Sequence, residues 1–383
     1  MSETRRGWYL LPGMALLAGG MILAGTAPLA GSAGAAPLAG SQNSPRVASL
    51  EQDGWAAIKA GKGPAATEAF REAIRLDPKN ASLRLGAGTA EFLQRHDPEA
   101  KVLLEQALDL DPKLIRARAQ LARVVKRQGD LTEAIRLYAI VATEVPDDNE
   151  VRDTLDRWKR ERDLHDSMRL EIGDHFTVSF EGAEDAAMAA QALESLTRAF
   201  WRICNAFAAY PPRSIPVILY SGEQFRDITR SPQWAAAAFD GAIRVPMRGA
   251  GEKGEDLDRV LAHEFAHALI RSMATRGLPT WVNEGLASAL ESDSLDWAET
   301  ALSKSPKTPS LTVLAAPFGR MNGHDAQVAY ATSALAAKRL LDDAGGVAIA
   351  NLLRDLGDGV DFEQAFLHRI QKSLADFQAS LQQ

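Results

Sequence analysis

Three proline residues set a fixed period in the first half of this chain. Pro78, Pro112 and Pro146 recur every 34 residues, and each one follows an amphipathic segment with helical spacing of its apolar residues. Small residues recur with the same period. They are Gly54, Gly88 and Ala122, then Ala66, Ala100 and Ala134. The period predicts a stack of helix–turn–helix units over residues 47–148, in which each unit buries its apolar face against the next.

The pattern resembles the tetratricopeptide repeat (TPR), and it predicts an all-α solenoid of three repeats over residues 47–148. The second repeat departs from it, because Arg84 and Glu91 stand where large apolar residues are usual. A charged helix over residues 149–167 is expected to cap the array, with Trp158 as its packing contact. Such a solenoid offers a groove to a peptide or envelope protein partner. The sequence leaves open the alternative that the repeats only position a second domain.

Residues 1–44 have the layout of an export signal and linker. Arg5 and Arg6 precede an apolar run over residues 8–30, which a stretch rich in Gly, Ala, Pro and Ser follows. The paired arginines resemble a twin-arginine signal, and ordinary Sec export competes evenly with it. We therefore expect the body of the protein in the bacterial periplasm or cell envelope. A membrane association is expected only if the signal is retained as an anchor.

Composition excludes several classes of protein. The net charge of −7 argues against a nucleic-acid surface, so no nucleic-acid partner is expected. Cys204 is the single cysteine, which rules out a disulfide framework and a thiolate zinc cluster. A chain of 383 residues is long enough for two or three domains.

Residues 263–267 read His-Glu-Phe-Ala-His, and they lie in a segment with a helical apolar period. His263 and His267 are four positions apart, so on a helix both side chains project from one face and can bind a single ion. Glu264 is offset by one position, which suits a carboxylate that must reach water at the ion without being a ligand. A catalytic zinc ion usually has a third protein ligand. Glu284, in a second predicted helix, is the candidate.

The motif H-E-x-x-H followed by P-x-W-x-x-E-G-x-A over residues 279–287 resembles the gluzincin zinc metallopeptidases, in particular the peptidase-MA-like domains. The resemblance implies an α+β, zincin-like domain over residues 170–381, with a small sheet, an active-site helix and a helical subdomain. It implies one Zn²⁺ held by His263, His267 and Glu284, with Glu264 as general base. Ser288 replaces the aspartate that would orient a histidine ligand in thermolysin-like enzymes, so either another group does so or the site binds metal more weakly.

The rest of this region is predicted from pattern. Alternating apolar residues predict strands over residues 175–180, 215–220 and 238–246, and a long helix over 186–208. By the resemblance, residues 240–245 are the candidate edge strand that binds an extended substrate, although an ordinary half-buried strand is as consistent with them. A polar loop is expected up to Ser310, then helices over 347–356 and 361–380. By the same resemblance, Tyr330, and less strongly His324, are candidates to donate a hydrogen bond to the oxyanion.

The leading hypothesis is an exported, zinc-dependent peptidase in which a zinc-bound water attacks the peptide bond with the help of Glu264. Its alternative is a catalytically silent interaction protein that combines TPR repeats with a zincin-like module. Hydrolysis of a non-peptide amide in the cell wall also stays open. The same three ligands could hold Fe(II), but Glu264 would then have no purpose.

Overall fold

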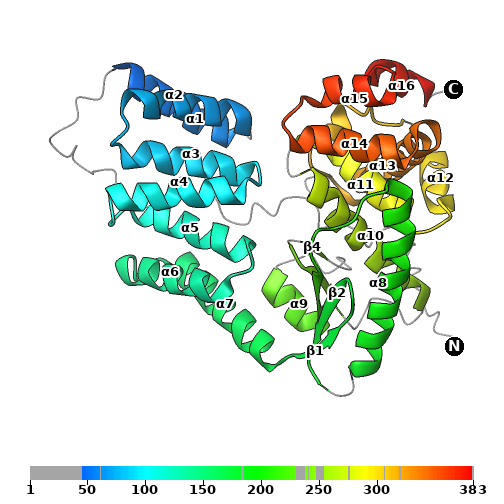
Figure 1. Ribbon diagram of the computed structural model, residues 1–383, viewed down its shortest axis with the longest axis horizontal. Helices are drawn as coiled ribbons and strands as arrows, with labels where there is room; N and C mark the ends of the chain where they lie inside the picture. Colours follow the sequence, from blue (N-terminus) through cyan, green and yellow to red (C-terminus); the bar gives the residue numbers. More distant parts are fainter. Residues whose placement is uncertain are drawn as a thin grey trace, which may run out of the picture. The chain divides into compact units, whose positions relative to one another are not determined.

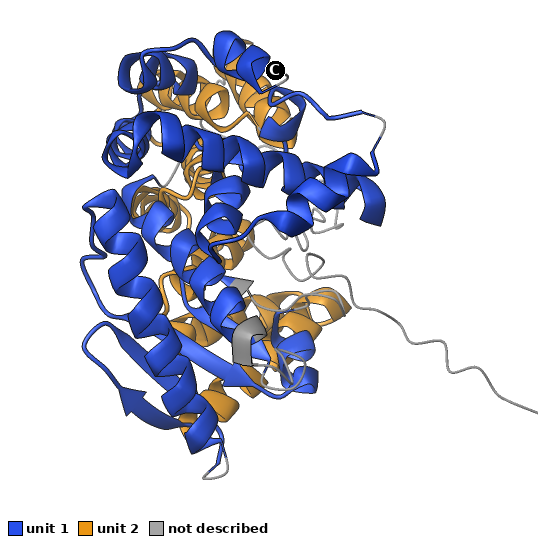
Figure 2. Ribbon diagram, turned by 90° about the vertical axis from the view of Figure 1, so that its right-hand side faces the viewer, with its two compact units in different colours: residues 1–22, 167–383 blue, residues 23–166 orange. Residues whose placement is uncertain are grey.

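The computed structural model describes residues 45–381, except for residues 61, 183–184, 230–237, 240, 247–253, 275–276, 306 and 319–320. The predicted export signal over residues 1–44 lies outside the described residues. The chain divides into two compact units that meet in sequence between Asp166 and Ser167 (Figure 2). Among the described residues, no helix combines the length and the apolar character needed to cross a membrane.

The unit before Ser167 is entirely helical within its described residues. Its helices are α1 (Pro45–Lys59), α2 (Gly63–Leu76), α3 (Ala81–Leu93), α4 (Asp97–Leu110), α5 (Ile115–Arg127), α6 (Leu131–Glu144) and α7 (Asn149–Ser167). Consecutive helices α1 to α6 pack in pairs and the pairs stack (Figure 1). The small residues of the period lie at these contacts. Ala66, Ala100 and Ala134 are fully buried, and a Cβ on Gly54 would lie 2.6 Å from the Phe70 ring. The helical solenoid expected from the period is therefore present.

Glu91 of the second repeat is a polar residue at a position where the TPR pattern usually has an apolar one. Neighbouring side chains bind its carboxylate. Thr67 donates a hydrogen bond to the Glu91 carboxylate over 3.0 Å, and His96 Nδ1 lies 2.5 Å from its other oxygen. These contacts satisfy a carboxylate that is largely buried between α2, α3 and the start of α4. The repeat therefore keeps its packing although its sequence is irregular.

Helix α7 closes the end of the array through an aromatic contact. The Trp158 side chain is buried, and its ring centroid lies 4.7 Å from that of Tyr138 in α6. Lys126 of α5 forms an ion pair with Glu161 of α7 over 3.0 Å. Helix α7 therefore caps the array, because it covers the apolar face that the third repeat would otherwise expose.

The unit from Ser167 onward contains one five-stranded sheet. Its strands are β1 (Arg169–Ile172), β2 (Phe176–Phe180), β3 (Ile215–Tyr220), β4 (Ala238–Phe239) and β5 (Ile243–Pro246), in the order β1-β2-β3-β5-β4. Strands β2, β3 and β5 run parallel, whereas β1 and β4 pair antiparallel with their neighbours.

The strand predicted over residues 238–246 is a hairpin instead of one strand. Phe239 of β4 pairs with Ile243 of β5, and Ala238 pairs with Arg244. The expectation of a sheet edge at residues 240–245 is therefore wrong for Ile243 and Arg244, which lie between β3 and β4. Asp240 lies outside the described residues. Strand β1 and helix α9 (Gly222–Thr229) were not predicted.

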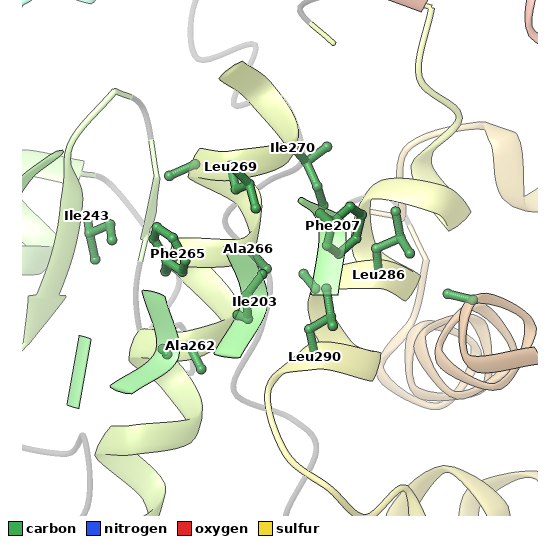
Figure 3. Packing of buried hydrophobic residues seen from close by; sticks show 14 of the residues in the cluster. Ile203, Phe207, Ile243, Ala262, Phe265, Ala266, Leu269, Ile270, Leu286 and Leu290 are labelled. Carbon is green, nitrogen blue, oxygen red and sulfur yellow. The ribbon is translucent and has the colours of Figure 1, made fainter. Parts of the chain in front are cut away.

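One face of the sheet packs on α8 (Ala186–Phe207) and α10 (Gly254–Met273) and forms the core. Val178, Val217 and Ile243 lie side by side in register on that face. Figure 3 shows residues of α10 lying between Ile243 and two residues of α11 (Thr280–Leu290), Leu286 and Leu290. The α10 residues in that view are Ala262, Phe265, Ala266, Leu269 and Ile270. The apolar side chains of α10 are therefore held in the core, which fixes the positions of His263 and His267 on the same helix.

The remainder of this unit is helical. It contains α11 (Thr280–Leu290), α12 (Asp296–Ser303), the 3-10 turn Val313–Ala315, α13 (Gly323–Ala344), α14 (Gly346–Gly357), α15 (Phe362–Ile370) and α16 (Leu374–Ser380). Two expectations are corrected here. The predicted loop up to Ser310 contains α12, and the helix predicted over residues 361–380 is broken at Gln371, where φ is 58°.

Candidate metal centre

Two helices bring together the three residues predicted to bind zinc. His263 and His267 lie one turn apart on α10, and Glu284 lies in the first turns of α11. Their ligand atoms lie within 4.8 Å of one another, and His267 Nε2 is 3.7 Å from Glu284 Oε2. All three side chains are buried. This spacing allows one ion to contact all three side chains after small adjustments.

The Nδ1 atom of each histidine has an oxygen partner from the neighbourhood of α11. His263 Nδ1 lies 2.8 Å from Glu291 Oε2, and His267 Nδ1 lies 3.2 Å from Asn283 Oδ1. Asn283 also donates a hydrogen bond from Nδ2 to Glu284 Oε1 over 3.1 Å. With Nδ1 occupied as a donor, the Nε2 atom of each imidazole is left as the lone-pair donor for an ion.

Glu291 is the residue of this site that sequence reasoning missed. Its side chain is fully buried at the C-terminal end of α11, and Arg259 of α10 donates to its second oxygen over 3.2 Å. Burial raises the pKa of Glu291 to about 7, and the nearby charge of Arg259 opposes that rise. The available signal was the spacing of Glu284, Ser288 and Glu291, which places all three on one face of a helix.

Two buried carboxylate oxygens of the site have no hydrogen-bond partner within the described part of the chain. They are Glu264 Oε2 and Glu284 Oε2. Burial, followed by the negative charges of Glu284 and Glu291, raises the pKa of Glu264 to about 8. Burying carboxylate oxygens without partners in this way costs free energy unless a cation compensates them. Two imidazoles and a carboxylate are also ligands that suit Zn²⁺, so the residues fit such an ion.

Burial also determines the protonation state of His263. It lowers the pKa of this imidazole well below its ordinary value, and the adjacent His267 lowers it further. His263 is therefore neutral near neutral pH. Neutral imidazole is the form that binds a metal ion, because protonation removes the lone pair.

Tyr330 lies with this cluster, although it comes from a later part of the chain. It is buried in α13, and its ring stands edge-on to Phe318 with centroids 5.3 Å apart. Burial and the nearby charges of Glu284 and Glu264 raise the pKa of the phenol well above its usual value. Tyr330 therefore keeps its proton and can donate a hydrogen bond. His324, the weaker candidate, is exposed at the start of the same helix.

The site thus combines groups with distinct chemical capacities in one buried region. It offers three donors for a cation, a carboxylate beside them whose pKa is above neutrality, and a phenol that remains protonated. Separated acid, base and electrophilic groups of this kind are typical of hydrolytic sites. The Ser288 hydroxyl is buried here and has no hydrogen-bond partner among the described residues.

Comparison with known proteins identifies the repeat region. The sequence profile of the tetratricopeptide repeat family matches residues 98–157, which span α4 to the middle of α7. The match supports a TPR solenoid in the first unit. It does not extend to α10, α11 or α13. No curated protein matches the chain.

Several solved TPR domains are similar to part of the chain. The second TPR domain of human RPAP3 in complex with an HSP70 peptide is 25% identical, and the match covers 30% of this chain and 95% of that one with a TM-score of 0.28. The TPR domain of Arabidopsis OM64 is 18% identical, over 30% and 96% of the two chains, with a TM-score of 0.29. The TPR2B domain of yeast Sti1 in its Hsp70 complex is 20% identical, over 31% and 98%, with a TM-score of 0.29.

Proposed function

We propose that this protein is a zinc-dependent peptidase whose TPR repeats dock a protein partner or substrate. The observation that carries the enzymatic part is the convergence of buried His263, His267 and Glu284 within 4.8 Å, beside the unpaired carboxylate oxygen of Glu264. The docking part is supported by the family match over residues 98–157, because TPR solenoids present a concave surface to other proteins.

In this proposal the three ligands hold Zn²⁺, which supplies Lewis acidity to polarise an amide carbonyl and to acidify a water molecule. Glu264 accepts the proton from the attacking water and delivers it to the leaving amine nitrogen. The pKa of Glu264 is raised in the metal-free protein, and a bound cation would stabilise the ionised carboxylate that accepts the proton.

Tyr330 has the second chemical role. Its protonated phenol donates a hydrogen bond to the carbonyl oxygen as negative charge develops there. Burial of the ring against Phe318 holds the hydroxyl in place before the substrate arrives. Such preorganisation is the reason a single hydrogen bond can lower the barrier substantially.

The deciding experiment compares the wild type with Glu264→Gln for zinc content and for hydrolysis of an unfolded protein substrate. The variant should bind zinc at the same stoichiometry and lose turnover, because glutamine cannot accept the proton. Glu171→Gln, at an exposed position of β1, is the matched control and should keep both properties. Turnover that persists in Glu264→Gln would refute the general-base role.

The competing function is an interaction protein whose second unit has no catalytic activity. The TPR match favours it, because that match concerns docking and does not extend to the candidate metal centre. A silent module has no need to hold zinc in a one-to-one ratio. Metal analysis of the purified protein therefore separates the two functions.

We also propose export from the cytoplasm, on the basis of the N-terminal sequence. Paired arginines, an apolar run and a small-residue segment within residues 1–44 support it. Sequencing the mature N-terminus after expression in a bacterial host tests the proposal. A protein that remains intact in the cytoplasm would contradict it.

A further inference from the structure

Polar residues on facing sides of α10 and α11 form a continuous series of contacts. Arg259, His263 and His267 are spaced by four positions and lie on one face of α10. Contacts from α11 reach all three. Asn283 meets His267 at one end, and Glu291 meets both His263 and Arg259 at the other. The two helices therefore run antiparallel, and these side-chain contacts, which include both imidazole rings, join them.

We propose that Glu291 is the positioning residue of His263 and that Arg259 fixes Glu291 for this task. This inference rests on the proposed function, because it concerns an ion held by His263, His267 and Glu284. Glu291 takes the place of the carboxylate that is missing at Ser288. It lies three positions after Ser288, at the C-terminal end of α11, and its longer side chain reaches the His263 imidazole.

The need for Arg259 follows from the burial of Glu291. The Glu291 side chain is fully buried, and its two oxygens have different partners: His263 Nδ1 at 2.8 Å and Arg259 Nη1 at 3.2 Å. A carboxylate bound at one oxygen only can rotate, and its free oxygen would be left buried without a partner. Arg259 removes both problems, because it bonds the second oxygen and supplies a compensating charge.

The consequence for metal binding is a defined orientation of one ring. Without Glu291, the His263 imidazole can rotate about its side-chain torsions and turn Nε2 away from the ion. Loss of an outer hydrogen-bond partner of a metal-binding histidine typically weakens metal affinity by about 10- to 100-fold. We expect about 100-fold weaker zinc binding for Glu291→Ala and about 10-fold for Glu291→Gln and Arg259→Met.

A purely structural role, in which this pair only joins α10 to α11, makes a different prediction. Losing a structural contact lowers the melting temperature equally with and without zinc and leaves zinc affinity unchanged. Losing a positioning contact reduces the increase in melting temperature that zinc produces, because that increase follows from the affinity. Asp258→Asn is the matched control. Asp258 neighbours Arg259 but pairs with Arg198 of α8, 3.0 Å away, so this variant alters an α10 contact without touching the metal centre.

The experiment measures the zinc dissociation constant of the full chain by competition with a chromophoric chelator, for wild type, Glu291→Ala, Glu291→Gln, Arg259→Met and Asp258→Asn. The visible absorption of the Co²⁺-substituted proteins reports ligand geometry independently of activity. We expect weaker zinc binding and an altered Co²⁺ spectrum in the Glu291 and Arg259 variants, and wild-type behaviour in Asp258→Asn.

Two outcomes overturn the inference. One is zinc affinity of the Glu291 variants within about threefold of wild type, far short of the loss expected for an outer-shell partner. The other is an equal loss in the Asp258→Asn control. If Glu291→Ala does not fold, the zinc affinities of Glu291→Gln and Arg259→Met test the positioning role instead. A wild-type protein that binds no zinc would refute the proposed function together with this inference, whereas unchanged variants of a zinc-binding wild type refute the inference alone.

Discussion

Gly285 of α11 lies directly against the backbone of Ser333 in α13. A Cβ at position 285 would overlap the Ser333 carbonyl oxygen and would lie 3.0 Å from the Ala337 Cβ. Gly285 follows the candidate ligand Glu284, and Ser333 lies one helical turn after Tyr330. The close crossing of these two helices therefore sets how near the phenol comes to the Glu284 carboxylate.

Gly285→Ala should damage stability and activity together. The added methyl group has to push α13 away from α11, and overpacking of this kind costs about 1–3 kcal/mol. The same shift withdraws Tyr330 from Glu284, so kcat should fall. Thermal unfolding and steady-state hydrolysis measure the two effects. Ser333→Ala is the control, because the contact involves the Ser333 backbone and that variant keeps it. Wild-type stability of Gly285→Ala would show that the crossing can adjust freely.

Tyr330→Phe should lower kcat while zinc content and KM stay close to wild type. The variant keeps the aromatic ring packed on Phe318 and removes only the hydrogen-bond donor. Removing one oxyanion donor typically costs about 100- to 1,000-fold in kcat. Tyr210→Phe, at an exposed tyrosine, is the control and should behave as wild type. An undiminished kcat in Tyr330→Phe would exclude the phenol from the reaction.

Glu264→Gln should stabilise the metal-free protein at neutral pH. The pKa of Glu264 rises from 4.5 in the unfolded chain to about 8 on folding, mainly because of burial. Below pH 4.5 the Glu264 carboxyl is protonated in both the folded and the unfolded protein, so it does not lower the free energy of unfolding. As the pH rises toward 8, the unfolded state ionises and the folded state does not, so stability falls. At pH 7 the penalty is on the order of 3 kcal/mol.

Chemical denaturation in the presence of a chelator, at pH 4.5 and pH 7, measures this effect. The gain from Glu264→Gln should be present at pH 7 and absent at pH 4.5, since glutamine does not titrate. Glu171→Gln, on exposed β1, should show no gain at either pH. A gain that is the same at both values would mean that the charge of Glu264 is not its cause.

Trp158→Ala should destabilise the repeat unit. The indole is 4% exposed and packs on Tyr138, so its removal leaves a cavity between α6 and α7. Truncations of this kind cost about 3–5 kcal/mol. Trp201→Ala is the contrast, because Trp201 is 49% exposed. Limited proteolysis followed by mass spectrometry should show earlier cleavage within residues 45–166 only for Trp158→Ala. Equal resistance of both variants would argue against a capping role for α7.

Patterns with a fixed spacing were the most informative part of the sequence. The 34-residue period predicted the paired helices α1 to α6, because small and apolar residues recur at defined positions in each unit. The spacing of His263 and His267 on one helix face, and a carboxylate on the next helix, pointed to three side chains that do lie together. In each case the residues that form the pattern lie close together in the sequence.

Features that depend on distant partners were missed. The apolar pattern predicts one strand over residues 238–246, although the pair Asp240-Gly241 is also a turn signal, and the structure has the β4–β5 hairpin there. The helical spacing from Glu284 places Glu291 on the right face of its helix, but its role depends on two side chains of another helix, which that spacing does not identify. The need for glycine at 285 likewise depends on the backbone of α13, about 50 positions later in the sequence.

The hairpin formed by α10 and α11 contains every candidate ligand of the ion and the groups that orient both histidines. The group expected to act on the substrate oxygen, Tyr330, belongs to α13 instead. Under the proposed function, a small displacement of α13 should therefore abolish turnover while the ion stays bound. Under this proposal, metal binding and turnover depend on different helices, so a change confined to α13 should alter kcat and leave the zinc dissociation constant unchanged.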